Sequence, residues 1–356
     1  MSQTVEAGVI MMRHKLIGRA VFPLVAVAFA FSVSRWSIAD TSSVPNTMAA
    51  AAIDQGGGPD VLSLHHLPVP KPNAGEVLIA VQAAGVGVWE AKIRRNPGTN
   101  VQFPLVLGSD GSGTIVAIGS GVSGFKVGDQ VYGTMGAFDA EYATVRAENI
   151  TRIPRGIGFT EAGILAISGL SALQGIDDIL QLKAGETLLI HGATGGVGTL
   201  AVQLAKARGV KVLATAPSEE GEALLSRLGA DAIVNGRTGD IAAAAKRLAP
   251  NGIDAVLGLI GGQELERCID TIRKDGRGRV AYLFGMEPLP KPRFGIRMTL
   301  YSFISGAREL ERLNNAVVEA KLQVPIAAEY SLADATQAHE RLEAGHLLGK
   351  IVLRVR

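Results

Sequence analysis

The spacing of apolar residues changes near Pro154. Between Met48 and about Asn149, short apolar segments such as Glu76–Val81 and Gly111–Ile118 are separated by Gly, Pro and Asn. Runs of this length between turn residues predict β-strands. The first part of the chain is therefore predicted to be a compact region rich in β-structure with few helices.

Beyond Pro154, strand and helix patterns alternate. A helical pattern covers Thr160–Leu180, and the tail from Ala307 to Arg356 carries two helices and a final strand, Lys350–Arg354. Between them the predicted strands are Thr187–His191, Lys211–Thr215, Ala232–Val234, Ala255–Leu259 and Arg279–Leu283, and the predicted helices are Val197–Arg208, Glu220–Leu228, Ile241–Leu248 and Glu264–Ile272. This alternation predicts an α/β fold with a doubly wound parallel sheet covered by helices on both faces.

The strongest local motif is the segment Leu188–Gly198, which reads LLIHGATGGVG. An apolar strand leads into a glycine-rich turn, and a helical pattern begins directly after it. Such a turn places backbone amides and the positive end of a helix dipole beside a pyrophosphate. The motif predicts a dinucleotide site formed by Ala193, Thr194, Gly195, Gly196, Val197 and Gly198.

The end of the next predicted strand indicates which dinucleotide is bound. An NAD site commonly places a carboxylate there to bind the ribose 2′-hydroxyl. This chain instead has Thr215 and Ser218, whose hydroxyls are candidate donors to a 2′-phosphate. Glu219 and Glu220 follow and are interpreted as acids that stabilise a helix N-terminus. The sequence therefore favours NADP(H) over NAD(H).

Composition excludes several other classes. The chain has 356 residues, a net charge of +2 and no long basic run, so a nucleic-acid surface is not expected. Cys268 is the only cysteine, which excludes an intrachain disulfide and a four-thiolate zinc site. We expect Cys268 to be a buried helix residue.

Residues 1–47 resemble a leader. Basic residues from Arg13 to Arg19 precede the apolar run Ala20–Val33, and Ser37–Ala39 resembles a cleavage site. The run is short and contains Pro23, so the mature chain is predicted to have no stable membrane span. A mis-started extension before Met48 is the alternative interpretation. We expect a cytoplasmic protein, where nicotinamide cofactors are supplied, with export as the alternative.

Several motifs together resemble one family, the medium-chain dehydrogenase/reductase superfamily, and within it the quinone-oxidoreductase branch that includes zeta-crystallin-like proteins. The motifs are Gly56–Leu62, Pro70–Pro72, Gly75–Val77, Ala84–Val86, Leu107–Gly113, Val127–Val131, Ala140–Tyr142, His191–Gly198, Leu228–Asp231 and Gly349–Leu353. The resemblance implies a GroES-like catalytic domain (residues 48–165 and 310–356), a Rossmann NADP-binding domain (residues 166–309) and a homodimer. It also implies reduction of quinones or α,β-unsaturated carbonyls by hydride transfer.

Zinc-dependent relatives carry a Cys near Gly87 and a Gly-His-Glu sequence within Leu107–Asp110. This chain has Gly87 and Gly108-Ser109-Asp110 there, which leaves too few ligands for a catalytic zinc. The protein is thus predicted to work without zinc. An enoyl-thioester reductase and a cofactor-binding protein with little catalysis are the alternatives.

The resemblance also directs attention to single side chains. Lys92 replaces a family tyrosine and is the first candidate to stabilise a developing oxyanion; a solvated lysine is the alternative interpretation. Trp89 is a candidate wall for a flat substrate or a core residue. On the cofactor side the candidates are Ser168, Arg237, Leu259, Phe284, Gly285 and Lys350. His191 is expected to anchor the glycine turn, and His339 and His346 are expected to face solvent or cap a helix.

Overall fold

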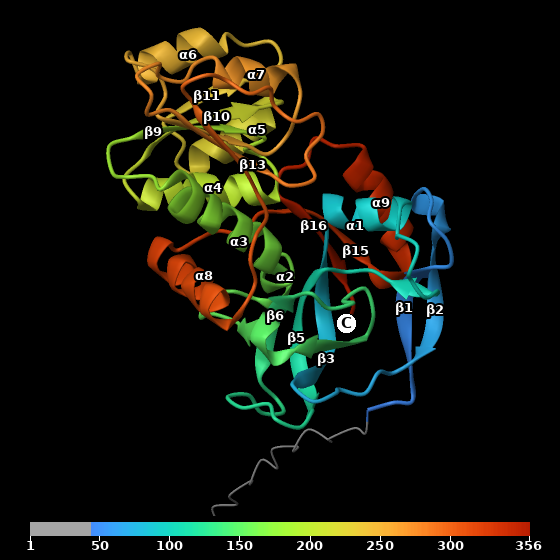
Figure 1. Ribbon diagram of the computed structural model, residues 1–356. Helices are drawn as coiled ribbons and strands as arrows, with labels where there is room; N and C mark the ends of the chain where they lie inside the picture. The colour runs from blue at the N-terminus through green and yellow to red at the C-terminus, as the bar shows by residue number, and fades with distance from the viewer. Residues whose placement is uncertain (1–43) are drawn as a thin grey trace, which may run out of the picture. The chain divides into compact units, whose positions relative to one another are not determined.

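The computed structural model of the protein describes residues 44–356, and Figure 1 shows the arrangement of their helices and strands. Val44–Arg356 form one compact unit. The predicted leader, residues 1–47, lies outside the described residues except at its end, where Thr47 begins strand β1 (Thr47–Ile53). Within residues 44–356, no helix combines the length and the apolar character needed to cross a bilayer.

A six-stranded sheet occupies the middle of the chain. Its strands are β9 (Thr187–His191), β10 (Lys211–Ala216), β11 (Ala232–Asn235), β12 (Ala255–Gly258), β13 (Arg279–Leu283) and β14 (Arg297–Tyr301). They lie in the order β11-β10-β9-β12-β13-β14, and every neighbouring pair is parallel. The chain changes direction across the sheet between β9 and β12, where open α/β sheets bind ligands. The predicted doubly wound Rossmann sheet is confirmed.

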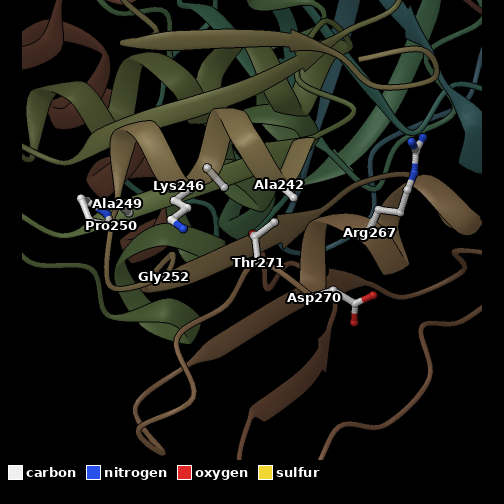
Figure 2. A pocket seen from close by; sticks show the side chains of 9 residues that line it. Ala242, Lys246, Ala249, Pro250, Gly252, Arg267, Asp270 and Thr271 are labelled. Atoms are coloured by element: carbon white, nitrogen blue, oxygen red, sulfur yellow. The ribbon is translucent and has the colours of Figure 1, made fainter. Parts of the chain in front are cut away.

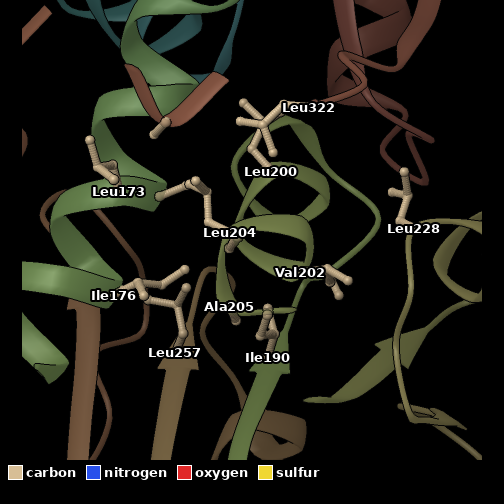
Figure 3. Close-up of a cluster of buried hydrophobic side chains, with 14 of the residues drawn as sticks. Leu173, Ile176, Ile190, Leu200, Val202, Leu204, Ala205, Leu228, Leu257 and Leu322 are labelled. Atoms are coloured by element: carbon tan, nitrogen blue, oxygen red, sulfur yellow. The ribbon is translucent and has the colours of Figure 1, made fainter. Parts of the chain in front are cut away.

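Alternate residues of these strands enter two different cores. The connecting helices are α4 (Gly196–Ala207), α5 (Glu219–Arg227), α6 (Ile241–Leu248) and α7 (Gln263–Ile269). Leu188 and Ile190 belong to the core under α4 and α5, whereas Leu189 belongs to the core under α6 and α7. A strand places successive side chains on opposite faces, so helices cover the sheet on both sides. Figure 3 shows the first core, where Ile190 and Leu257 point toward the covering helices.

A second large sheet combines the first part of the chain with its tail. Its strands are β3 (Glu76–Val86), β5 (Asp110–Ile118), β6 (Gln130–Thr134), β7 (Tyr142–Arg146), β8 (Ile150–Arg152), β15 (Ile326–Ser331) and β16 (Lys350–Arg354). The order is β15-β16-β3-β5-β6-β8, and β7 pairs with β3. A smaller sheet joins β1 to β2 (Leu62–Pro68) and β4 (Leu105–Val106). The predicted β-rich, GroES-like part is confirmed.

Four further helices pack around the sheets. They are α1 (Val88–Arg95), α3 (Ala166–Gln174), α8 (Ala307–Ala320) and α9 (Ala335–Glu343). Helix α8 packs against α3 and α4, whereas α9 packs against β15 and β16. The division into residues 48–165 with 310–356 and residues 166–309 stays a prediction, and the strands of each large sheet fall within one of these parts.

The structure differs from the predicted elements in two places. The single helix predicted over Thr160–Leu180 is divided into α2 (Phe159–Ala162), α3 and a π-helical turn, Gly175–Leu180. A Cβ on Gly163 would lie 2.8 Å from Cβ of Ala83, so the helix ends where its backbone packs on β3. Strands β14 and β15 were not predicted, because their residues are only partly buried and carry little strand pattern.

Candidate active site

A cavity of about 1060 Å³ lies at the carboxyl ends of β9 and β12 and is lined by residues from both large sheets. It brings together most of the predicted site residues: Trp89, Lys92, Ser168, Thr194, Gly195, Gly196, Val197, Gly198, Thr215, Arg237, Leu259, Phe284, Gly285 and Lys350. Two predicted residues do not line it. Ala193 is fully buried beneath the loop, and Ser218 lies at the start of α5.

The glycine loop leaves open space at one position and packs tightly at another. A Cβ built on Gly195 meets nothing closer than the carbonyl oxygen of Gly192, at 3.8 Å. A Cβ on Gly198 would lie 2.5 Å from Cα of Ala193, where α4 packs on the strand end. Gly195 caps α4 without a side-chain hydrogen bond. The first amides of α4 therefore have no side-chain acceptor at the cap, and the loop fits a dinucleotide pyrophosphate.

The two hydroxyls predicted to bind a 2′-phosphate, those of Thr215 and Ser218, make hydrogen bonds within the protein instead. The Thr215 Oγ1 accepts a hydrogen bond from the backbone N–H of Gly192 at 3.2 Å and lies 3.1 Å from Nδ1 of His191. The Ser218 Oγ accepts a hydrogen bond from the backbone N–H of Gly221 at 3.3 Å, as a helix N-cap does. Both side chains thus hold the strand end and the next helix in place.

A positive charge remains at this end of the cavity. Arg237 is exposed, lines the cavity and makes no ion pair within residues 44–356. Its loop is held by Arg267, whose guanidinium donates to the carbonyl oxygens of Gly236 and Arg237 at 2.6 and 3.2 Å. Helix α7 therefore positions Arg237, which is one of the predicted residues on the cofactor side.

Helix α1 meets the loop after β13 across the cavity. Trp89 and Lys92 are three residues apart, so both side chains lie on the same side of the helix. The rings of Trp89 and Phe284 are tilted, with their centroids 6.1 Å apart, and both rings remain partly exposed. The Lys92 ammonium donates a hydrogen bond to the carbonyl oxygen of Gly285. The two catalytic candidates therefore border the same aromatic recess.

A buried ion pair lies beside the glycine loop. Nζ of Lys350 lies 2.9 and 2.8 Å from the two carboxylate oxygens of Asp110, and neither side chain is more than 10% exposed. Glu90 is also buried, and its Oε1 accepts the backbone N–H of Ser109 at 3.1 Å. Burial raises the pKa of Glu90, while the nearby Lys350 lowers it by less. Glu90 and Lys350 line the cavity, so this wall is charged.

The tail of the chain is bonded directly to the glycine loop. The backbone N–H of Gly349 donates to the carbonyl oxygen of Thr194 at 2.7 Å, and Gly195 and Gly349 form a parallel bridge. Strand β16 also pairs antiparallel with β3, with Ile351 opposite Val86. Lys350 is thereby fixed between the glycine loop and the first part of the chain.

Two histidines have structural surroundings. Burial lowers the pKa of His191, and its ring contacts Thr215, in keeping with an anchor for the glycine turn. The expectation for His339 was wrong, because this residue is fully buried. Its Nδ1 accepts a hydrogen bond from Nε of Arg94 at 3.3 Å, and burial followed by the Arg94 charge lowers its pKa to about 4. The helical pattern of the sequence around His339 did not reveal that Arg94 is buried beside it.

A second cavity, of about 200 Å³, lies between α6 and α7 (Figure 2). Lys246 comes from the α6 side, and Arg267 and Asp270 come from the α7 side. It is lined by neither the glycine loop nor the aromatic pair. Cys268, on the same helix, is fully buried as expected.

Some lining residues were not predicted from sequence. Met135 follows β6. Tyr301 ends β14, which was not expected as a strand, and residues 302–303 follow it. The Asp110–Lys350 pair was also missed, since its partners are 240 residues apart. Within residues 44–356, no three His, Cys, Asp or Glu side chains are grouped as metal ligands.

Two family models match the chain. The alcohol dehydrogenase GroES-like domain matches residues 73–167, and the zinc-binding dehydrogenase family matches residues 228–353. Human quinone oxidoreductase is 32% identical over 325 residues, which cover 86% of this chain and 97% of the human protein.

Solved structures agree with these matches. The quinone oxidoreductase from Coxiella burnetii is 32% identical with a TM-score of 0.76, covering 87% of this chain and all of that chain. The Escherichia coli quinone oxidoreductase, solved in complex with NADPH, is 25% identical with a TM-score of 0.78, covering 86% of this chain and all of that chain. The chain belongs to the quinone-oxidoreductase branch of the medium-chain dehydrogenase/reductase superfamily. It is an oxidoreductase.

Proposed function

We propose that the protein is an NADPH-dependent reductase of quinones or α,β-unsaturated carbonyls that works without zinc. The observation that carries the proposal is one cavity that joins an open pyrophosphate loop at Gly195 to an aromatic recess at Trp89 and Phe284. A flat, electron-poor substrate suits such a recess, because aromatic rings stack on it. The human and bacterial relatives named above are quinone oxidoreductases.

In this proposal, different residues of the cavity bind different parts of the cofactor. The amides at Gly195–Gly198 would bind the pyrophosphate, Arg237 the 2′-phosphate, and Ser168 the nicotinamide ribose. Leu259 and Gly285 would line the nicotinamide half, beyond the carboxyl ends of their strands. Bound NADPH supplies the hydride. The chain then has to orient the acceptor and stabilise the negative charge that develops on its oxygen.

Lys92 is the proposed electrophile of this site. One of its three N–H groups is bonded to the Gly285 carbonyl, which holds the ammonium at the wall of the aromatic recess. The other N–H groups are available to an acceptor oxygen. Preorganised donors of this kind commonly contribute about 10²–10³ in kcat.

Zinc independence belongs to the proposal. The positions that match zinc ligands of relatives are Gly87 and Ser109, neither of which offers a thiolate or an imidazole. Metal analysis of the purified protein is expected to find substoichiometric zinc, and a chelator is expected to leave activity unchanged. Stoichiometric zinc whose removal abolishes turnover would overturn this part.

The substrate class is tested by incubating the protein with NADPH and panels of quinones, enones and enoyl thioesters while following NADPH absorbance. We expect turnover with quinones or enones. Turnover confined to enoyl thioesters would replace the proposal with an enoyl-thioester reductase. Micromolar NADPH binding without turnover on any panel would indicate a binding protein instead.

Two further expectations concern the whole molecule. Strand β14 ends the six-stranded sheet, and the exposed Leu300 and Phe294 lie on or beside it, so we propose a homodimer through this edge. Light scattering that gives the monomer mass at micromolar concentration would contradict it. We also propose a cytoplasmic location, where NADPH is supplied, and N-terminal sequencing of the protein from cell fractions tests it against export.

A further inference from the structure

Four buried ionisable side chains gather behind the charged wall of the cavity. Glu90 comes from α1, Asp110 from β5, Asp139 from the loop between β6 and β7, and Lys350 from β16. Their exposed fractions are 2%, 0%, 0% and 8%. We call this group the acid–lysine cluster. Lys350 is paired with Asp110, whereas the carboxyl groups of Glu90 and Asp139 have no cationic partner in residues 44–356.

Asp139 is the unusual member. Neither of its carboxyl oxygens has a hydrogen-bond partner within residues 44–356, and neither reaches the surface. An ionised carboxylate without donors is far more costly to bury than a neutral carboxylic acid. Burial, with Glu90 and Asp110 nearby, raises the pKa of Asp139 well above its ordinary value, and Lys350 opposes this only in part. Burial without a hydrogen-bond donor therefore favours the protonated form of Asp139.

The cluster reaches the cavity at Gly87. A Cβ built on Gly87 would lie 3.0 Å from Oε2 of Glu90 and 4.0 Å from Nζ of Lys350, so both groups face the room that this glycine leaves. Lys350 also reaches the glycine loop, since a Cβ on Gly196 would lie 3.1 Å from its Cβ. Lys350 lines the cavity, and two of its three N–H groups are bonded to Asp110, which leaves one N–H group without an acceptor within residues 44–356.

We propose that Lys350 gives the proton that completes the reduction, and that the carboxyl groups of Glu90 and Asp139 store the proton that replaces it. This step rests on the proposed function. After hydride transfer the acceptor oxygen carries a negative charge. The N–H bond of Lys350 breaks and an O–H bond forms on that oxygen, which leaves a neutral amine. Nζ then takes a proton from a carboxyl group of the cluster. That group becomes a carboxylate and regains its proton from solvent before the next turnover.

Lys92 is not equivalent to Lys350 in this respect. Its bonded neighbour is the carbonyl oxygen of Gly285, which cannot supply a proton. Lys92 is therefore suited to orient and polarise the acceptor, whereas Lys350 has carboxyl groups behind it. The two lysines approach the cavity from α1 and from β16.

The stored proton is observable without any turnover. The infrared C=O band of a protonated carboxylic acid is expected in the wild-type protein at neutral pH and is expected to weaken in Asp139→Asn. Asp129→Asn is the matched control, because Lys126 and Arg152 bind Asp129 and the Lys126 hydrogen bonds lower its pKa to about 2. Its spectrum should keep the band. An unchanged band in Asp139→Asn would show an ionised Asp139 and overturn the proposal.

The same proton affects stability. The folded protein keeps the Asp139 proton at pH values where the unfolded chain has lost it. The free energy of unfolding therefore falls as pH rises from the ordinary carboxyl pKa to the raised one. Asp139→Asn should flatten this decline, although Glu90, Asp110 and Lys350 still face the site. An identical slope in the variant would contradict a stored proton.

Lys350→Arg tests the donor, because arginine keeps the positive charge but does not release its proton. We expect circular dichroism and NADPH affinity close to those of the wild type, with kcat lowered about 10²–10⁴-fold, the usual contribution of a general acid. Unchanged kcat would overturn the proposal. Should this variant not fold, Glu90→Gln is expected to lower kcat and enlarge the solvent deuterium isotope effect, and an unchanged isotope effect would count against the store. Wild-type protein that oxidises no NADPH would refute the proposed function, whereas the infrared result would stand independently.

Discussion

The cavity has two walls that differ in chemical character. The glycine-loop wall (Ala193–Gly198) offers backbone amides and open space above Gly195. The second wall is formed by Glu90 and Lys350 of the acid–lysine cluster, whose four side chains come from three elements and one loop. The first wall leaves space because it lacks side chains, and the second holds ionisable side chains that are almost fully buried. The first suits a constant part of the cofactor, and the second suits the position where charge changes during reaction.

Asp110→Asn is the strongest test of the charged wall. It leaves the Lys350 ammonium buried without its carboxylate, so the free energy of unfolding should fall by about 3–5 kcal/mol. Urea denaturation followed by circular dichroism measures this. Glu329→Gln is the control on the neighbouring strand, because the exposed Glu329–Arg354 pair, at 3.3 Å, should contribute at most about 1 kcal/mol. If the free energy of unfolding fell equally in both variants, the buried Asp110–Lys350 pair would stabilise the fold no more than the exposed Glu329–Arg354 pair.

Gly195→Val tests the glycine-loop wall. Its side chain would fill the open space, so NADPH affinity should fall roughly 100-fold, or about 2.8 kcal/mol, while the melting temperature stays near the wild-type value. Gly198→Ala is the matched variant, because its Cβ would contact Ala193 and lower the free energy of unfolding by about 1–3 kcal/mol. Fluorescence titration and thermal melts separate the two effects. Wild-type affinity in Gly195→Val would place the pyrophosphate elsewhere.

Arg237→Ala examines the one place where the glycine-loop side uses a charged side chain. We expect NADPH affinity to fall about tenfold, because a hydrogen bond to a charged group contributes about 1.5–3 kcal/mol and this arginine is exposed. NADH affinity should not change, since NADH has no 2′-phosphate. Competitive titration of both cofactors measures the difference. A similar loss for NADH and NADPH would exclude the 2′-phosphate role.

Ser218→Ala gives the smallest expected effect. Removal of the N-cap of α5 should lower the free energy of unfolding by about 1 kcal/mol. The ratio of NADPH to NADH affinity should change little, because the hydroxyl is used by the Gly221 amide. A large change in that ratio would indicate that Ser218 contacts the 2′-phosphate, as the sequence predicted.

The two walls also differ in how well they could be predicted from sequence. The glycine loop was predicted because strand, turn and helix lie within one short segment, Leu188–Gly198. The Asp110–Lys350 pair depends on β16 returning to β3, and no local period reports that pairing. Asp139 carries no motif at all, and its unpartnered carboxyl group is visible only after the loop is folded. Contacts between distant segments were beyond the reach of pattern analysis.

The bond between Gly349 and the glycine loop has a consequence for movement within the site. The backbone N–H of Gly349 donates to the carbonyl oxygen of Thr194, and Lys350 is the next residue, at the start of β16. A displacement of the loop is therefore passed directly to the backbone that carries the lysine. The two walls are mechanically coupled through a single peptide unit.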